Sequence, residues 1–264
     1  MTLPVIRFRT LLILGAILVV LLFMAWTAYQ FDQAAIQSVR HDYSYSIELS
    51  YNSTMEDVTL MLPVPEQDHT PFFMESILNK TAYGVSPDWN YTIVRQNGTP
   101  MLAIKAARMV PEYHGYPIAI EPGASVLPTT LVPGHEYSGD TPILVPVTIA
   151  VIIPVEKEIN TSDPVGHEPV FFPDGGFTPG SCTIPPCDGQ VYDHRVPVYL
   201  SYTAEHPVSL SLRVSIQGTN AIWRGGWTSH GYSDTVVIET VSDTRGWIMG
   251  EGRLFTSMDA KIVG

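Results

Sequence analysis

Two stretches of the chain alternate apolar and polar side chains without interruption. In residues 43–51 (YSYSIELSY) and 208–216 (VSLSLRVSI), every second residue is apolar. A period of two is typical of a β-strand with one buried and one solvent-exposed face. Nine residues at about 3.3 Å each give strands about 30 Å long. We therefore expect two long strands with one face in a core.

Shorter patterns predict further strands at 58–62, 91–96, 101–106, 143–153, 196–202, 235–241 and 247–255. Asn97-Gly98 predicts a tight hairpin between the second and third of these. Residues 143–155 (ILVPVTIAVIIPV) are apolar at nearly every position, which predicts a strand covered on both faces. A short helix is expected where Thr70 serves as N-cap and Pro71 as the first helical residue.

A different pattern occupies residues 10–31, which carry no charged side chain. Twenty helical residues reach about 30 Å, the thickness of the hydrocarbon core of a bilayer. Arg7 and Arg9 precede this run, and the first ionisable residue after it is Asp32. Positive charge at one end keeps that end cytoplasmic. The sequence thus predicts a cytoplasmic stub (1–9), a transmembrane signal-anchor helix (10–31) and an extracytoplasmic domain (32–264).

Two alternatives to an uncleaved anchor are a buried core helix and a cleaved signal peptide. A signal peptide has a shorter apolar region, about 7–15 residues, and small residues before its cleavage site. Cleavage after Ala28 would place the bulky Trp26 at the −3 position. Trp26, Tyr29 and Phe31 are instead typical of the aromatic belt at the outer membrane interface. We expect the protein to be a single-pass protein of the cell membrane.

The fold class expected for residues 32–264 is mostly β, an antiparallel β-sandwich that is Ig-like or related. The chain contains 22 Pro and 20 Gly, and dense turn signals separate the predicted strands. The Pro/Gly-rich segment 156–190 is predicted to be a long loop within one domain. The alternative is two small β domains divided within that loop.

Composition limits the class of partner. Without Arg7 and Arg9, the chain has 12 basic and 26 acidic residues, a net charge of −14. Such a surface repels nucleic acid, which we exclude as a partner. Five of the six asparagines stand in Asn-x-Ser/Thr triplets, which predicts a glycosylated exterior: Asn52, Asn79, Asn90, Asn97 and Asn160.

The segment 171–193 contains both cysteines of the chain. In an oxidising exterior, the closely spaced Cys182 and Cys187 predict a disulfide that closes a tight loop. The same segment holds Asp174, Asp188 and Asp193, whose carboxylates are the type of ligand that Ca²⁺ prefers. No known calcium-loop spacing is present, so we expect a rigid recognition loop and no cofactor, with Ca²⁺ as the alternative.

Candidate chemistry is sparse. Six of the eight histidines stand beside an acidic residue, and neighbouring residues in a strand point to opposite faces. If a transition-metal site exists, the candidate ligands are His135, His167 and His194. Ser229-His230 is not a nucleophile motif, because adjacent side chains do not bring imidazole to hydroxyl. No catalytic residue is predicted.

Aromatic residues offer the remaining candidate surface. Trp223, Trp227 and Trp247 lie close together in the sequence, and we expect them to belong to the core of the last strands. The alternative is an exposed recognition surface that includes Phe177, Trp223 and Trp227. The sequence thus favours a membrane-anchored binding, adhesion or structural envelope module without catalysis. Its expected partners are the lipid bilayer, through residues 10–31, and an envelope glycan or membrane protein; the alternative is an extracytoplasmic hydrolase or metal-binding enzyme.

Overall fold

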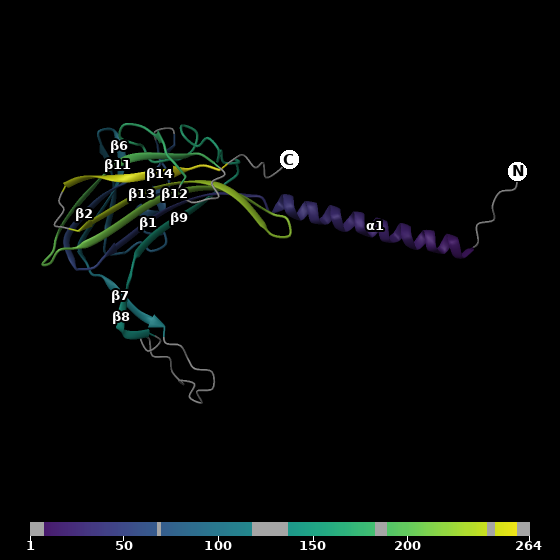
Figure 1. Ribbon diagram of the computed structural model, residues 1–264, viewed down its shortest axis with the longest axis horizontal. Coiled ribbons are helices and arrows are strands. Elements are labelled where there is room, and N and C mark those ends of the chain that lie inside the picture. The colour runs from purple at the N-terminus through teal and green to yellow at the C-terminus, as the bar shows by residue number, and fades with distance from the viewer. Residues whose placement is uncertain (1–7, 68–69, 118–136, 183–188, 242–245, 258–264) are drawn as a thin grey trace, which may run out of the picture.

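The computed structural model describes residues 8–67, 70–117, 137–182, 189–241 and 246–257. One apolar helix precedes a mostly β body (Figure 1). The elements are α1 (Phe8–Gln37), β1 (Arg40–Tyr51), β2 (Met55–Pro63), β3 (Glu66–Gln67), β4 (Thr70–Pro71), α2 (Met74–Leu78), β5 (Asn90–Gln96), β6 (Thr99–Met109), β7 (Glu112–Pro117), β8 (Tyr137–Val145), β9 (Val147–Val155), β10 (Thr178–Pro179), β11 (Val191–Thr203), β12 (Ser209–Trp223), β13 (Trp227–Val241) and β14 (Gly246–Phe255).

Ten strands form one antiparallel sheet. Their order is β5-β6-β2-β11-β14-β13-β12-β1-β9, and β10 pairs with β11 beside this path. Strands from before and after the segment 156–190 therefore lie side by side, as in the pairing of β1 with β12 and of β2 with β11. The two stretches with perfect alternation pair directly, since Tyr45 lies opposite Ile216 and Leu49 opposite Leu212.

The sheet curls around the main hydrophobic core (Figure 1). The alternating apolar residues of β1 and β12 face inward, where Tyr45, Leu210 and Leu212 are at most 1% exposed. The segment 156–177 also contributes to the interior, because Ile159 and Phe171 are buried in the same cluster. The expected antiparallel β architecture is confirmed. One continuous curled sheet takes the place of the two hydrogen-bonded layers that define a sandwich.

The hairpin between β5 and β6 follows the sequence prediction. Gln96 pairs with Thr99, so Asn97 and Gly98 form a two-residue turn. Their φ angles are 51° and 91°, and a turn of this kind requires positive φ at both central positions. Glycine accepts such a conformation without steric cost, and asparagine tolerates it better than most residues.

The prediction that residues 143–155 form one strand covered on both faces is wrong. The segment divides at Pro146 into β8, which pairs with β7 in a separate ribbon, and β9. β9 is the last strand of the main sheet, and Ile152 on its outer face is 68% exposed. Proline has no amide hydrogen to donate to a sheet, so the ladder is interrupted there.

The predicted start of the short helix is also wrong. Thr70 and Pro71 pair as β4 with β3, and α2 begins at Met74. Phe73 precedes it with a φ of 72° and without a capping side chain. Met74 and Ile77 are buried, so tertiary packing and not a cap accounts for this helix.

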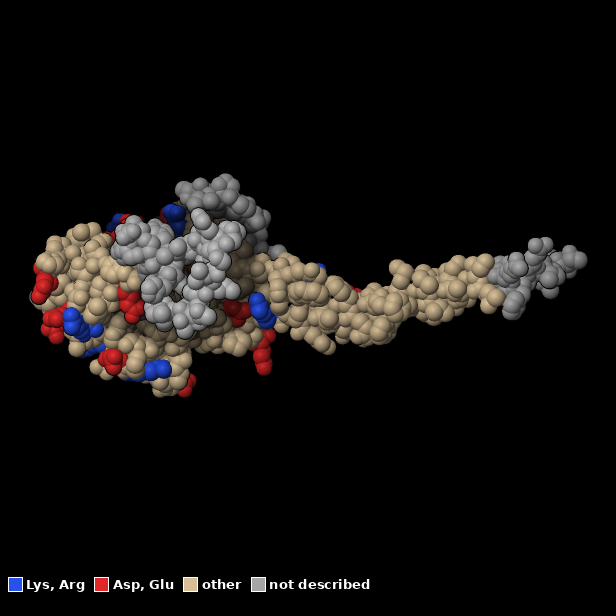
Figure 2. All heavy atoms as spheres, turned by 90° about the horizontal axis from the view of Figure 1, so that it is seen from below, with Lys and Arg blue, Asp and Glu red and all other residues tan. Residues whose placement is uncertain are grey.

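Helix α1 extends away from the body as one uninterrupted rod (Figure 1). Within the described residues, Leu11–Gln37 is long and apolar enough to cross a membrane, with a mean hydropathy of 2.7 in a window where no residue is buried. Figure 2 shows most of its length without a charged side chain, whereas acidic and basic residues are scattered over the body. The helix continues past the predicted end at residue 31 and meets the sheet directly.

Candidate functional site

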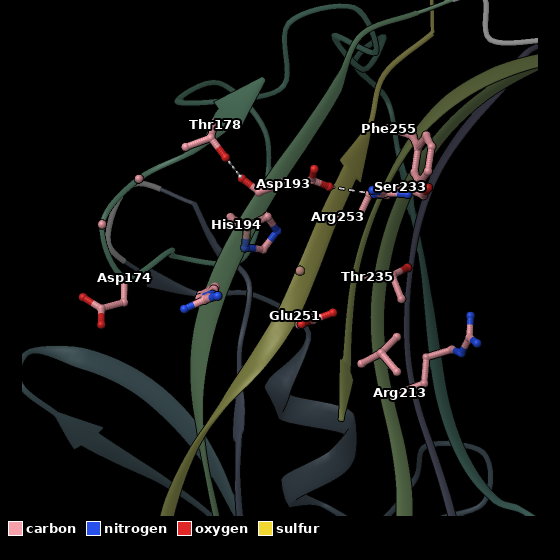
Figure 3. A pocket seen from close by; sticks show the side chains of 15 residues that line it. Asp174, Thr178, Asp193, His194, Arg213, Ser233, Thr235, Glu251, Arg253 and Phe255 are labelled. Carbon is pink, nitrogen blue, oxygen red and sulfur yellow. Dashed lines mark hydrogen bonds and ion pairs between the residues drawn. The ribbon is translucent and has the colours of Figure 1, made fainter. Parts of the chain in front are cut away.

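A hollow of 820 Å³ lies on the outer face of the sheet, over β11, β14, β13 and β12 (Figure 3). The segment that contains Asp174 and Thr178 forms one wall. Alternation along the strands directs Arg253 and Phe255 of β14 to this face, while Leu254 between them is buried. The charged lining residues are of both signs: Asp174, Asp193, Arg195, Arg213, Glu251 and Arg253.

Asp193 and Arg253 form an ion pair in the wall of this hollow. They are cross-strand partners, and Nε of Arg253 donates to Oδ1 of Asp193 at 2.7 Å. Both side chains are partly exposed, and the hydrogen bond and charge of Asp193 raise the pKa of Arg253. The hydroxyl of Thr178 donates to the carbonyl of Asp193 at 2.9 Å and ties the wall to the strand. The pair thus presents a fixed carboxylate and guanidinium to the hollow.

His194 is among the residues that line the hollow, but its side chain is buried. Its Nε2 lies 2.7 Å from Oδ1 of Asp234, and neither side chain is accessible to solvent. Oδ2 of Asp234 accepts the amide hydrogen of Phe171 at 3.0 Å. Within the described part of the chain, Nδ1 of His194 has no hydrogen-bond partner. The buried pair therefore fastens the segment around Phe171 to the sheet, and its lack of exposure separates it from any ligand in the hollow.

A second buried polar cluster holds the segment 156–177 against the inner face of the sheet. The Tyr43 hydroxyl donates to Oε2 of Glu168, whose Oε1 accepts the amide hydrogen of Asn160 at 2.6 Å. The Tyr232 hydroxyl donates to the carbonyl of Pro169 at 2.6 Å. Burial, and then the hydrogen bond to Glu168, raises the pKa of Tyr43 above the ordinary phenol value. Burial is also the main cause that raises the pKa of Tyr232. These groups satisfy one another and act as a clamp on the segment.

The described residues do not bring the predicted metal ligands together. His135 lies outside the described residues. His167 is an exposed side chain 3.7 Å from Asp163, whereas His194 pairs with Asp234. The described residues contain no group of three or more His, Cys, Asp or Glu side chains that could hold a metal.

Other predicted sites have mixed outcomes. Asp174 and Asp193 line the same hollow, but Asp188 lies outside the described residues. Cys187 does too, so the disulfide with Cys182 stays a prediction. Four of the sequon asparagines are exposed, whereas Asn160 is half-buried and its Oδ1 accepts hydrogen bonds from Ser162 and from the amide of Asp163. Their glycosylation stays a prediction.

The tryptophans do not form the predicted core. Trp227 is 57% exposed and Trp247 is 43% exposed, because both lie at strand ends beyond the packed interior. Trp223 and Trp227 are cross-strand partners next to the turn between β12 and β13. The third residue of the predicted recognition surface lies elsewhere, since Phe177 packs against His194 with ring centroids 4.9 Å apart.

Apart from Asp174, Asp193 and His194, sequence reasoning missed the residues that line the hollow. Alternation predicts that Arg213 faces solvent, and Arg253 follows the same rule within 247–255. Nothing in the sequence says which strands become neighbours, so the pairing of Asp193 with Arg253 was not available from it. A comparison with protein-family models gives no match, and comparisons with curated proteins and with solved structures give none either.

Proposed function

We propose that this chain is a single-pass membrane protein whose β body lies outside the cell. Arg7 and Arg9 precede the apolar part of α1, and no basic residue follows until Arg40, a distribution that favours a cytoplasmic N-terminus. Side chains along α1 are exposed and apolar, which suits lipid and not water. In this arrangement, the curled sheet serves as a rigid, sandwich-like domain held at the membrane surface.

The body is proposed to bind a glycan of the cell envelope through the outer hollow. One observation carries this proposal: an open hollow of 820 Å³ lined by carboxylates, guanidinium groups, hydroxyls and the ring of Phe255. Saccharide hydroxyls both donate and accept hydrogen bonds, so alternating acids and arginines match them. The volume is in the range of known ligand sites. A membrane protein is the alternative partner.

The histidine–acid pair that the described residues place beside the hollow is buried, which argues against its use as a general acid–base pair. His194 lines the hollow, but its side chain and that of Asp234 have no solvent-accessible area, so a substrate in the hollow does not reach the imidazole or this carboxylate. General acid–base catalysis requires the catalytic group within hydrogen-bond reach of the reacting atoms. The geometry therefore supports recognition by Arg253, Glu251 and their neighbours.

The test measures binding of the full chain, reconstituted in lipid nanodiscs, to soluble polysaccharide fractions of cell envelopes. Arg253→Ala and Glu251→Gln each remove a charged hydrogen-bonding group from the hollow and should weaken binding roughly tenfold or more. Arg108→Ala removes an exposed arginine of β6 outside the hollow and should leave affinity unchanged. The proposal fails if no fraction binds, or if all three variants bind as the wild type does.

A further inference from the structure

The turn between β12 and β13 projects from the body toward α1 (Figure 1). β1 pairs with β12 only as far as Ala221, and β14 pairs with β13 only from Ser233 onward. The end of the hairpin therefore extends beyond its neighbouring strands. Its tip is the sequence Trp-Arg-Gly-Gly-Trp, residues 223–227, in which the amide of Arg224 donates to the carbonyl of Gly226 at 2.9 Å.

Helix α1 holds this tip at a fixed place. The rings of Phe31 and Trp223 have centroids 5.5 Å apart. Ala35 and Ile222 are buried against each other in a small cluster of their own. The amide of Trp223 donates to Oγ of Ser38 at 2.8 Å. Because apolar contacts and a hydrogen bond act together, the tip keeps a fixed position along the helix axis, beside Phe31.

The position of Phe31 along α1 corresponds to the outer boundary of the hydrocarbon core of a bilayer. Phe31 follows Leu11 by twenty residues, and at about 1.5 Å per residue this rise is about 30 Å, one hydrocarbon thickness. If Leu11 lies at the inner boundary, Phe31 lies at the outer one. The hairpin tip, which contacts Phe31, then lies among the outer headgroups.

The chemistry of the tip suits that layer. Trp227 is 57% exposed, and the guanidinium of Arg40 lies 4.2 Å from its ring centroid. Arg224 at the turn is exposed as well. Tryptophan and arginine place an apolar body in the interface and a polar group in the wet headgroup layer. The two arginines contrast with the net charge of −14 for the chain after Arg9, although Asp32 on the adjoining helix is acidic.

We infer that residues 223–227 form a second membrane contact, seated in the lipid headgroup layer of the outer leaflet. Together with α1, this contact fixes the tilt of the body relative to the membrane. The inference rests on the proposed single-pass arrangement. It adds that the body does not swing freely on its helix, so the outer hollow has a set orientation to the surface.

The test uses tryptophan fluorescence of the full chain in vesicles that contain phosphatidylcholine brominated near the headgroup or deep in the acyl chain. Variants keep one tryptophan each, with Phe at the other four positions. The Trp227 variant should lose emission to the shallow quencher more than to the deep one. Trp247 is the matched control, because it is also exposed but lies at the end of β14 away from the hairpin tip, and its emission should not change.

The Trp26 variant distinguishes failure of the inference from failure of the proposed span. If Trp26 is quenched and Trp227 is not, the second contact is wrong and the single-pass arrangement stands. If Trp26 is not quenched by either lipid, the span itself is wrong. Should the multiply substituted chains fold poorly, the difference in quenching between the wild type and Trp227→Phe isolates the same side chain. Equal quenching of those two proteins would overturn the inference.

Discussion

The ring of Phe31, near the body end of α1, lies against the ring of Trp223 in β12 with an angle of 47° between their planes. This contact joins the apolar helix α1 to the end of the hairpin formed by β12 and β13. Ser38 and Val39, which follow the end of α1, also contact β12 before β1 begins at Arg40. Helix and body are therefore linked by side-chain packing as well as by the chain itself.

Replacing Phe31 with Ala should loosen this junction. An aromatic pair contributes about 0.5–1.5 kcal/mol beyond the area it buries. We expect faster hydrogen exchange at the amide of Trp223, which bonds to Ser38 of the same junction, with little change in unfolding of the body. Phe23→Ala is the control, since Phe23 is 61% exposed along the helix and should leave that amide unaffected. Equal exchange rates in both variants would contradict the role of Phe31.

Removing the hydroxyl of Tyr43 should destabilise the body. Tyr43→Phe removes the hydroxyl that donates to Oε2 of Glu168 and leaves the amide of Asn160 as donor to this buried carboxylate. A buried polar group that loses a partner costs about 1–3 kcal/mol. Chemical denaturation followed by tryptophan emission should report this loss in the free energy of unfolding. Tyr83→Phe, at a side chain 75% exposed, should be neutral; equal stability of the two variants would exclude a clamp at Glu168.

A methyl group at position 252 should displace the imidazole of His194. A Cβ built on Gly252 would lie 2.2 Å from Cε1 and 2.4 Å from Nδ1 of that buried ring. Overpacking of this kind typically costs about 1–3 kcal/mol. We expect Gly252→Ala to lower the melting temperature measured by circular dichroism. Gly226→Ala meets open space and should change stability by less than about 0.5 kcal/mol. An unchanged melting temperature for Gly252→Ala would show that the ring can move.

Alkaline pH should unfold the body through its buried tyrosines. Burial raises the pKa of Tyr45, and burial also raises that of Tyr91 to about 12. A phenol with a higher pKa in the folded state keeps its proton when the unfolded chain has lost it. Stability is therefore complete below the unfolded pKa near 10 and falls as pH rises from there toward the folded values.

Phenolate absorbance and circular dichroism, recorded together, check this expectation. Exposed phenols such as Tyr83 should ionise first, and the buried ones should ionise together with loss of β signal. Tyr45→Phe should shift the midpoint of alkaline unfolding to higher pH than in the wild type. The comparison corrects for any difference between the two proteins in the free energy of unfolding at neutral pH. Smooth ionisation of all tyrosines near pH 10 with the β signal intact would contradict the burial.

The sequence by itself determined the elements whose signal is local. The uncharged run from Thr10 predicts α1 because a helix satisfies its own backbone and needs only apolar side chains in lipid. The alternation in 43–51 and 208–216 predicts β1 and β12, because side chains on a strand necessarily point to opposite faces. Asn97-Gly98 likewise determines its turn, since few residue pairs accept positive φ twice.

Only the tertiary structure decided which of these elements meet. The apolar run 143–155 is compatible both with a strand covered on two faces and with an edge strand. Because β9 is the last strand of the sheet, Ile152 is exposed. The pairing of Asp193 with Arg253, and of Phe31 with Trp223, joins residues 60 and 192 positions apart. Such contacts depend on strand order and on the curl of the whole sheet, which no local pattern encodes.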